Sequence, residues 1–146
     1  MLHFGIEKLE YKVRFDKSCY YPFTLSEERK HTKLLFGACF GLWWHNNSIS
    51  ISFKPSETKL DKIDIYRYIF SDEFEENKCI GSLDIEKEYT LKLMFDHYNN
   101  SYVIQAISDS DHQQVINYSK QYKYPYIPFG YSIKKNHGSK ILLERQ

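Results

Sequence analysis

The most unusual segment of the chain is residues 41–48, GLWWHNNS, which joins both tryptophans to a group of polar side chains. Alternation along a strand would turn one indole inward and the other outward. An outward Trp44 could stack on the apolar face of a sugar ring while His45 and Asn47 bond the sugar hydroxyls. The alternative is that one indole fills the core, the other packs under a loop, and the polar groups satisfy turn backbone. We expect Trp44, His45 and Asn47 to line a ligand site.

A second constellation is Tyr66, Arg67 and Tyr68. Period-two alternation sends the two tyrosines to one face of a strand and Arg67 to the other. A tyrosine pair of this spacing offers a flat amphipathic surface to an extended ligand. The alternative is a pair of cross-strand neighbours that stabilise the sheet by about 0.2–1 kcal/mol without binding anything. We expect Tyr66, Arg67 and Tyr68 to belong to the ligand-binding site.

The same residues allow an enzyme as the alternative function. In a polysaccharide lyase or hydrolase, Arg67 would neutralise a uronate while His45, Tyr66 or Tyr68 moves the proton. Nothing in their spacing demands this chemistry. The chain also contains no G-x-G-x-x-G, G-x-x-x-x-G-K-[ST], G-x-S-x-G or H-E-x-x-H string, which disfavours nucleotide-dependent and zinc-protease chemistry. The sequence leaves catalysis open, assigns no catalytic residue and favours binding without turnover.

Metal and cofactor sites find little support in the sequence. No two histidines are spaced two or four apart, which is how one strand or helix offers two imidazoles to a metal. Cys19, Cys39 and Cys79 form no C-x-x-C pair, so neither a zinc knuckle nor a disulfide framework is indicated. We therefore expect no metal and no cofactor.

Charge and hydropathy limit the partners. Residues 118–126 alternate tyrosine and lysine, a pattern that also occurs where single-stranded nucleic acid binds. However, 20 basic against 19 acidic residues give a net charge of +1, which disfavours binding of a polyanion. An edge strand protected from pairing by lysine and proline would account for the same residues. No apolar run approaches the ~20 residues of a membrane span and no signal sequence is visible. We expect no nucleic acid partner, no membrane partner and a cytoplasmic location.

The elements that must position these groups are strands. The 146 residues suffice for one domain, 1–146, and period-two alternation recurs along most of it. Between residues 48 and 53 it predicts a dry face of Ile49, Ile51 and Phe53 and a wet face of serines. About ten short strands fold best as two packed sheets. We predict an all-β, antiparallel two-sheet sandwich of jelly-roll type, with strands at 11–15, 33–44, 48–53, 61–70, 78–83, 89–95, 102–107, 114–118, 122–131 and 140–144.

Several short motifs, taken in order, carry a family resemblance. They are SCY at 18–20, KLLFG at 33–37, HNNS at 45–48, IYRY at 65–68 and PFGY at 128–131. The chain thereby resembles small uncharacterised bacterial jelly-roll proteins with a K-L-x-G stretch, an H-x-N-S turn, a Y-x-Y strand and a late Y-F-G-G element. Tyr131 stands where that pattern has its second glycine. The resemblance implies two antiparallel sheets and supplies no activity.

Together these features favour a non-catalytic binding module for a saccharide or a similar polar, extended ligand. Besides the lyase or hydrolase, a second alternative is a structural or assembly protein. In that case, exposed tyrosines would meet another subunit and the chain would form a homo-oligomer.

Overall fold

The computed structural model describes residues 8–17, 32–40, 47–71, 75–96, 99–121, 128–132 and 141–145. Within these ranges the strands form two five-stranded antiparallel sheets. Sheet I has the order β10 (Ile141–Arg145), β1 (Lys8–Phe15), β6 (Glu88–Asp96), β7 (Ser101–Ser108), β8 (Gln114–Gln121). Sheet II has the order β5 (Glu75–Asp84), β4 (Lys62–Ser71), β3 (Asn47–Pro55), β2 (Lys33–Phe40), β9 (Pro128–Ser132). Among these ranges no helix is long and apolar enough to cross a bilayer.

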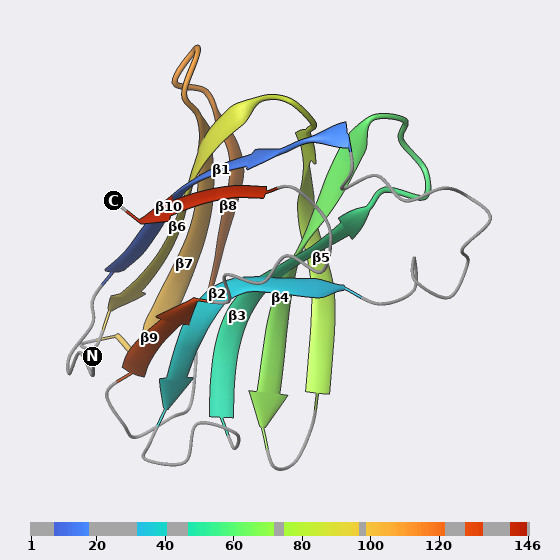
Figure 1. The fold of residues 1–146 in the computed structure, drawn as a ribbon. Coiled ribbons are helices and arrows are strands. Elements are labelled where there is room, and N and C mark those ends of the chain that lie inside the picture. Colours follow the sequence, from blue (N-terminus) through green and yellow to red (C-terminus); the bar gives the residue numbers. More distant parts are fainter. Residues whose placement is uncertain are drawn as a thin grey trace.

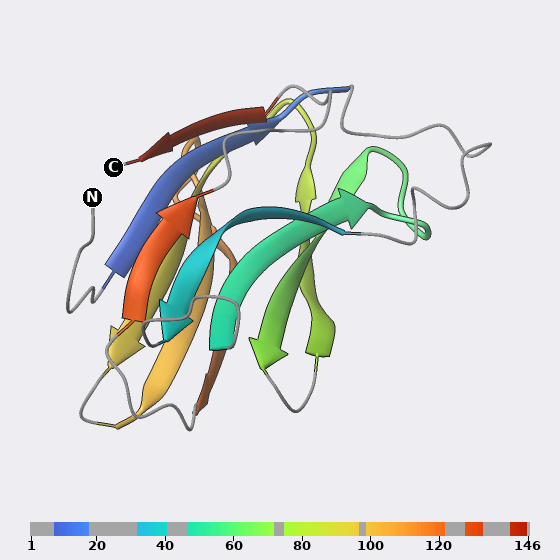
Figure 2. The ribbon, with the colours of Figure 1, turned by 60° about the horizontal axis from the view of Figure 1, so that its bottom comes forward.

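The two sheets lie face to face as two layers (Figure 1, Figure 2). Aromatic contacts join them, because the rings of Tyr11 and Phe36 lie 4.4 Å apart and those of Phe15 and Phe53 lie 4.9 Å apart between centroids. The all-β prediction with two antiparallel sheets is confirmed. The jelly-roll type and the number of strands stay predictions.

Alternation explains why these segments are strands. In β6 and β7 every second side chain is buried and the others are half-exposed. Each buried aliphatic or aromatic side chain stabilises the fold by about 1.5–3 kcal/mol relative to an exposed one. In the turn from β6 to β7, Asn100 has a positive φ of 49°, a conformation that asparagine tolerates better than most residues. The described part of the predicted 33–44 strand is β2, and residues 122–127 of another lie outside the described residues.

Strand β3 corrects one expectation. Its isoleucines and Phe53 are buried as predicted, but the serine face is not wet, because Ser50 and Ser52 are 0% exposed. In register, Ser50 lies between Gly37 and Tyr68, and Ser52 lies beside Tyr66. Ser48 is also buried, so the serine face of β3 is closed to water along most of the strand.

The close approach of β2 to β3 leads to a stability prediction. A Cβ added at Gly37 would lie 2.5 Å from the backbone oxygen of Ile49 and 2.5 Å from Ser50 Cβ. Neither can move without displacing the strand, so Gly37→Ala should lower the free energy of unfolding by about 1–3 kcal/mol. Urea denaturation measures this change.

Gly81→Ala is the matched control. Its added Cβ would meet only the Ile116 side chain of sheet I, at 2.6 Å from Cγ1, and a side chain yields more readily than a backbone. We expect a smaller loss of stability for this variant. Equal losses for the two variants, or no loss at Gly37, would show that the β2–β3 spacing is not the constraint we infer.

Candidate functional site

The two faces of β4 carry the candidate site. Tyr66 and Tyr68 are half-buried on the outer face of sheet II, whereas Arg67 is buried with 1% exposure on the inner face, toward sheet I. This is the arrangement that the alternation predicts. The structure therefore brings the two tyrosines together and separates them from Arg67 by the thickness of the sheet.

The outer face of sheet II, called here the tyrosine face, presents Tyr66, Tyr68 and Asn77, with the buried Ser50 and Ser52 beside them. In register, Ser50, Tyr68 and Asn77 follow one another across β3, β4 and β5. The Ser52 hydroxyl donates to Asn77 Oδ1 at 3.4 Å. Hydrogen-bonding groups thus flank two phenol rings on one flat surface.

Charged groups border the tyrosine face. The Tyr68 hydroxyl donates to the Glu75 carboxylate, and Lys54 Nζ lies 5.4 Å from the centroid of the Tyr66 ring. Asn77 Nδ2 donates to Thr32 Oγ1 at 3.0 Å. An amide, a carboxylate and an ammonium group therefore surround the rings, which is the mixture of donors and acceptors that a polyhydroxyl ligand uses.

Desolvation by burial raises the pKa of Tyr66 to about 12, and the negative charges of Cys79, Asp64 and Glu57 add to the effect. A general base works best when its pKa lies near the operating pH. The Tyr66 phenol consequently stays protonated at neutral pH and keeps its proton available for donation to a ligand.

On the inner face, Arg67 is the centre of a polar group that we call the Arg67 cluster: Arg67, Glu76, Lys78, Tyr102 and Tyr118. Arg67 Nη1 donates to the Tyr102 hydroxyl at 3.3 Å, and Nη2 donates to Glu76. The guanidinium carbon lies 5.6 Å from the centroid of the Tyr118 ring, within the range of a cation–π contact. Burial raises the pKa of Tyr102 to about 12, so this phenol is also protonated.

Sequence reasoning found Arg67 but not its partners. The one available signal is the alternation in β7, which puts Tyr102 on the same face as the buried Ile104 and Ala106. Glu76 and Lys78 reach the inner face because the β4–β5 pairing shifts between Ile65 and Tyr66, and nothing in the sequence marks this irregularity.

The remaining predicted site residues are only partly placed. Trp44 and His45 lie outside the described residues. Asn47 begins β3 and pairs with Ser71, and its side chain lies outside the description. Among the described residues, no group of three or more His, Cys, Asp or Glu side chains could hold a metal ion.

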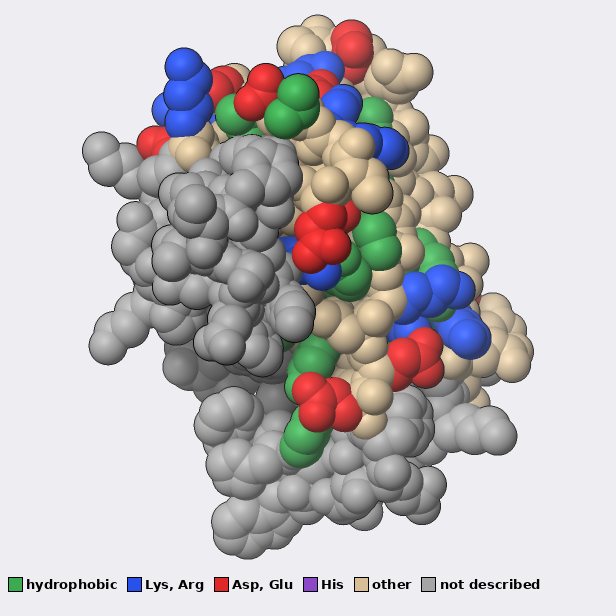
Figure 3. Space-filling view, turned by 90° about the vertical axis from the view of Figure 1, so that its right-hand side faces the viewer, with side chains coloured by type: hydrophobic (Ala, Val, Ile, Leu, Met, Phe, Trp, Pro, Cys, Tyr) green, Lys and Arg blue, Asp and Glu red, His purple; other side chains and the backbone are tan. Residues whose placement is uncertain are grey.

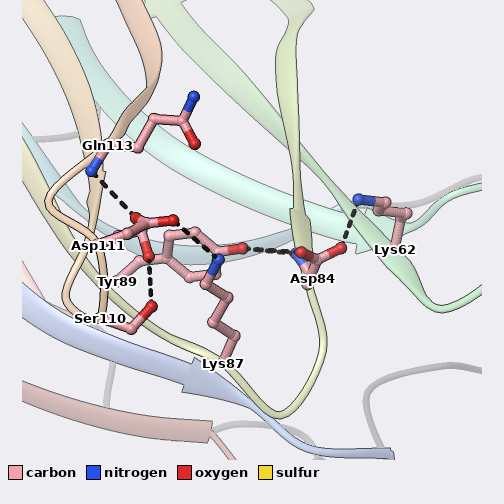
Figure 4. A network of polar contacts seen from close by, with 8 residues as sticks. Lys62, Asp84, Lys87, Tyr89, Ser110, Asp111 and Gln113 are labelled. Atoms are coloured by element: carbon pink, nitrogen blue, oxygen red, sulfur yellow. Dashed lines mark hydrogen bonds and ion pairs between the residues drawn. The ribbon is translucent and has the colours of Figure 1, made fainter.

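A separate polar network supports the turn between β5 and β6 (Figure 4). Asp84 pairs with Lys62 and, through its backbone N–H, donates to the Tyr89 hydroxyl at 3.0 Å. Lys87 Nζ lies 4.0 Å from Asp111 Oδ2. The hydrogen bond from Lys62 lowers the pKa of Asp84 below its ordinary value of 3.8. These contacts tie β4, β5 and β6 together.

Acid should weaken the fold through two carboxylates. The pKa of Asp84 is lowered from 3.8, and the hydrogen bond from Arg67 lowers the pKa of Glu76 from 4.5. Because the unfolded chain binds protons more tightly at both groups, their contribution is complete above about pH 5 and is lost as the pH falls through the folded-state values. We expect urea-derived stability to decline below pH 4.5, and the double variant Asp84→Asn, Glu76→Gln to decline less steeply. Identical acid profiles for wild type and variant would contradict this assignment.

Comparison with known proteins gives a limited result. No family model matches the chain, and no curated protein matches it. Among solved structures, the carbohydrate-binding module CBM66 from Bacillus subtilis aligns over 99% of this chain and 74% of its own, with a TM-score of 0.43 and 11% identity. A likeness at this score and identity carries no argument, so the function has to be argued from the geometry of the described residues.

Proposed function

We propose that the chain is a non-catalytic binding module for a saccharide or a similar polar, extended ligand, and that the ligand lies on the tyrosine face. The observation that carries the proposal is the placement of Tyr66 and Tyr68 on one face, half-exposed and bordered by Asn77, Glu75 and Lys54. Phenol rings supply contact area at low entropic cost, and the polar border supplies hydrogen bonds. Trp44, His45 and Asn47 remain proposed members of this site.

Two features favour binding over the lyase or hydrolase. Arg67 lies on the opposite side of sheet II from Tyr66 and Tyr68, so it cannot neutralise a uronate that rests on the tyrosines. The pKa of Tyr66, raised to about 12, also makes that phenol a poor base at neutral pH. The described residues thus supply recognition groups without an activated proton acceptor.

We also propose the jelly-roll winding of the sandwich. The chain passes from sheet I to sheet II between β1 and β2, returns between β5 and β6, and passes again between β8 and β9. Repeated crossings between two antiparallel sheets are what such a winding requires.

The test is retention of the protein on a panel of immobilised polysaccharides, with new reducing ends and unsaturated products assayed in the same samples. We expect retention on at least one glycan without product. Product formation would overturn the non-catalytic assignment. Absence of retention on every glycan, with self-association in concentration-dependent sedimentation, would favour the assembly protein instead.

A further inference from the structure

One buried polar atom of the Arg67 cluster has no hydrogen-bond partner among the described residues: Arg67 Nε. The guanidinium lies over the Tyr118 ring, whose hydroxyl interacts with that of Tyr102. An unmet buried donor or acceptor costs about 1–3 kcal/mol, and native structures contain few of them. The free Nε–H of Arg67 therefore indicates that a polar partner belongs there.

The charge around these atoms is positive. Lys78 pairs in register with Arg67, and its Nζ lies 5.3 Å from the centroid of the same Tyr118 ring. Lys120 also acts on Glu76, whose pKa is lowered first by the Arg67 hydrogen bond and further by the charges of Lys120 and Lys78. Arg67, Lys78 and Lys120 thus face one carboxylate, which leaves an excess of positive charge for an anion to offset.

The geometry of Arg67 specifies the kind of anion. Nε–H and Nη2–H of a guanidinium form a fork that fits the two oxygens of a carboxylate. Of these two groups in Arg67, Nη2 donates to Glu76 while Nε stays unpartnered. Glu76 therefore fills half of the fork, and a second carboxylate in its place would fill both halves.

The position of Glu76 makes this exchange feasible. It lies on the edge strand β5, which contacts the edge strand β8 of the other sheet, and its side chain is 48% exposed. Rotation of Glu76 outward would release Arg67 Nη2 for another carboxylate. Figure 3 views the molecule from the β5 side, where acidic and basic side chains are interspersed and hydrophobic ones form only small groups. This surface suits a charged ligand better than an apolar one.

We infer that the place where β5 meets β8 is a binding site for the carboxylate of an acidic ligand such as a uronate. Arg67 holds the carboxylate through Nε and Nη2, and Lys78 and Lys120 attract it. When no ligand is bound, the Glu76 carboxylate takes the place of the ligand carboxylate. The inference does not depend on the tyrosine face, which lies on the other side of sheet II.

The experiment measures the thermal midpoint in sodium glucuronate, in sodium chloride of equal ionic strength, and in methyl glucoside as the neutral sugar. The proteins are wild type, Glu76→Gln and the double variant Lys78→Ala, Lys120→Ala, all changed at exposed side chains. At about ten times the dissociation constant, glucuronate should raise the midpoint by about 3–6 °C above the chloride sample. Methyl glucoside should have no such effect.

The variants decide whether the site is the one inferred. Glu76→Gln should bind glucuronate several-fold more tightly than wild type, because the neutral amide competes less well for Arg67. The lysine variant should bind several-fold more weakly. Equal shifts of the thermal midpoint in chloride and in glucuronate would overturn the inference. Water would then be the partner of the unpaired Arg67 Nε. Equal glucuronate shifts in all three proteins would also overturn it, because binding would then occur elsewhere.

Discussion

Replacing Arg67 by alanine should lower the free energy of unfolding by about 2–4 kcal/mol. The side chain is 1% exposed, so its removal leaves an unfilled space between the sheets and deprives the Tyr102 hydroxyl of its donor. Loss of one partner of a fully buried ion pair costs about 3–5 kcal/mol. We expect less here because Glu76 is 48% exposed and can return to water. Urea denaturation followed by circular dichroism measures the change.

Glu76→Gln is the control for this variant. It keeps the volume of the side chain and removes its charge at a half-exposed position, so the expected cost is at most about 1 kcal/mol. A Glu76→Gln variant as unstable as Arg67→Ala would show that the ion pair, and not the buried arginine with its phenol contacts, stabilises this part of the sandwich. A loss below about 1 kcal/mol for Arg67→Ala would contradict its placement in the core.

The double variant Tyr66→Ala, Tyr68→Ala should lose retention on any glycan that holds the wild type. Truncation of an aromatic side chain at the centre of a binding surface commonly costs more than 1–2 kcal/mol, so we expect at least about tenfold weaker binding for each tyrosine. The thermal midpoint should change little, because both rings are half-exposed on the outer face. Affinity electrophoresis in the retained glycan, beside a melting curve, gives both values.

Val115→Ser is the matched control for the tyrosine variant. Val115 is 41% exposed and lies on β8 of the other sheet, so its replacement should leave retention unchanged. A large drop in midpoint for the tyrosine variant would assign both rings to the core, and unchanged retention would remove them from the ligand site.

The alternation of side chains was enough to predict much of the fold. It predicted that Tyr66 and Tyr68 share one face of β4 and that Arg67 lies on the other, as observed. Period-two spacing has this power because successive side chains of a strand point to opposite faces.

What covers each face could not be predicted in the same way. Ser50 and Ser52 alternate like an exposed row, yet both are 0% exposed. Periodicity predicts which residues share a face, but it does not predict what packs over that face. The wet side expected for β3 was wrong for this reason.

The Arg67 cluster is a second feature that side-chain alternation could not predict. With regular pairing, the residue opposite Tyr66 would be Ile80, and Glu76 and Lys78 would project from the outer face. The irregularity between Ile65 and Tyr66 pairs Tyr66 with Cys79 instead, which turns Glu76 and Lys78 toward Arg67. A one-residue shift changes the face of every later side chain in the strand. No residue type in β4 or β5 indicates that the shift occurs.

The central claim is that ligands bind on the outer face of β4 and β5, at the two tyrosines. Its most direct test is a titration of the ¹⁵N-labelled protein with an oligosaccharide of the glycan that retains it, followed by two-dimensional amide NMR. We predict that the largest shifts fall on Ser52, Tyr66, Tyr68 and Asn77, the residues that share the outer face of sheet II. Shifts confined to sheet I, or a saturating titration that leaves these four amides in place, would contradict the account.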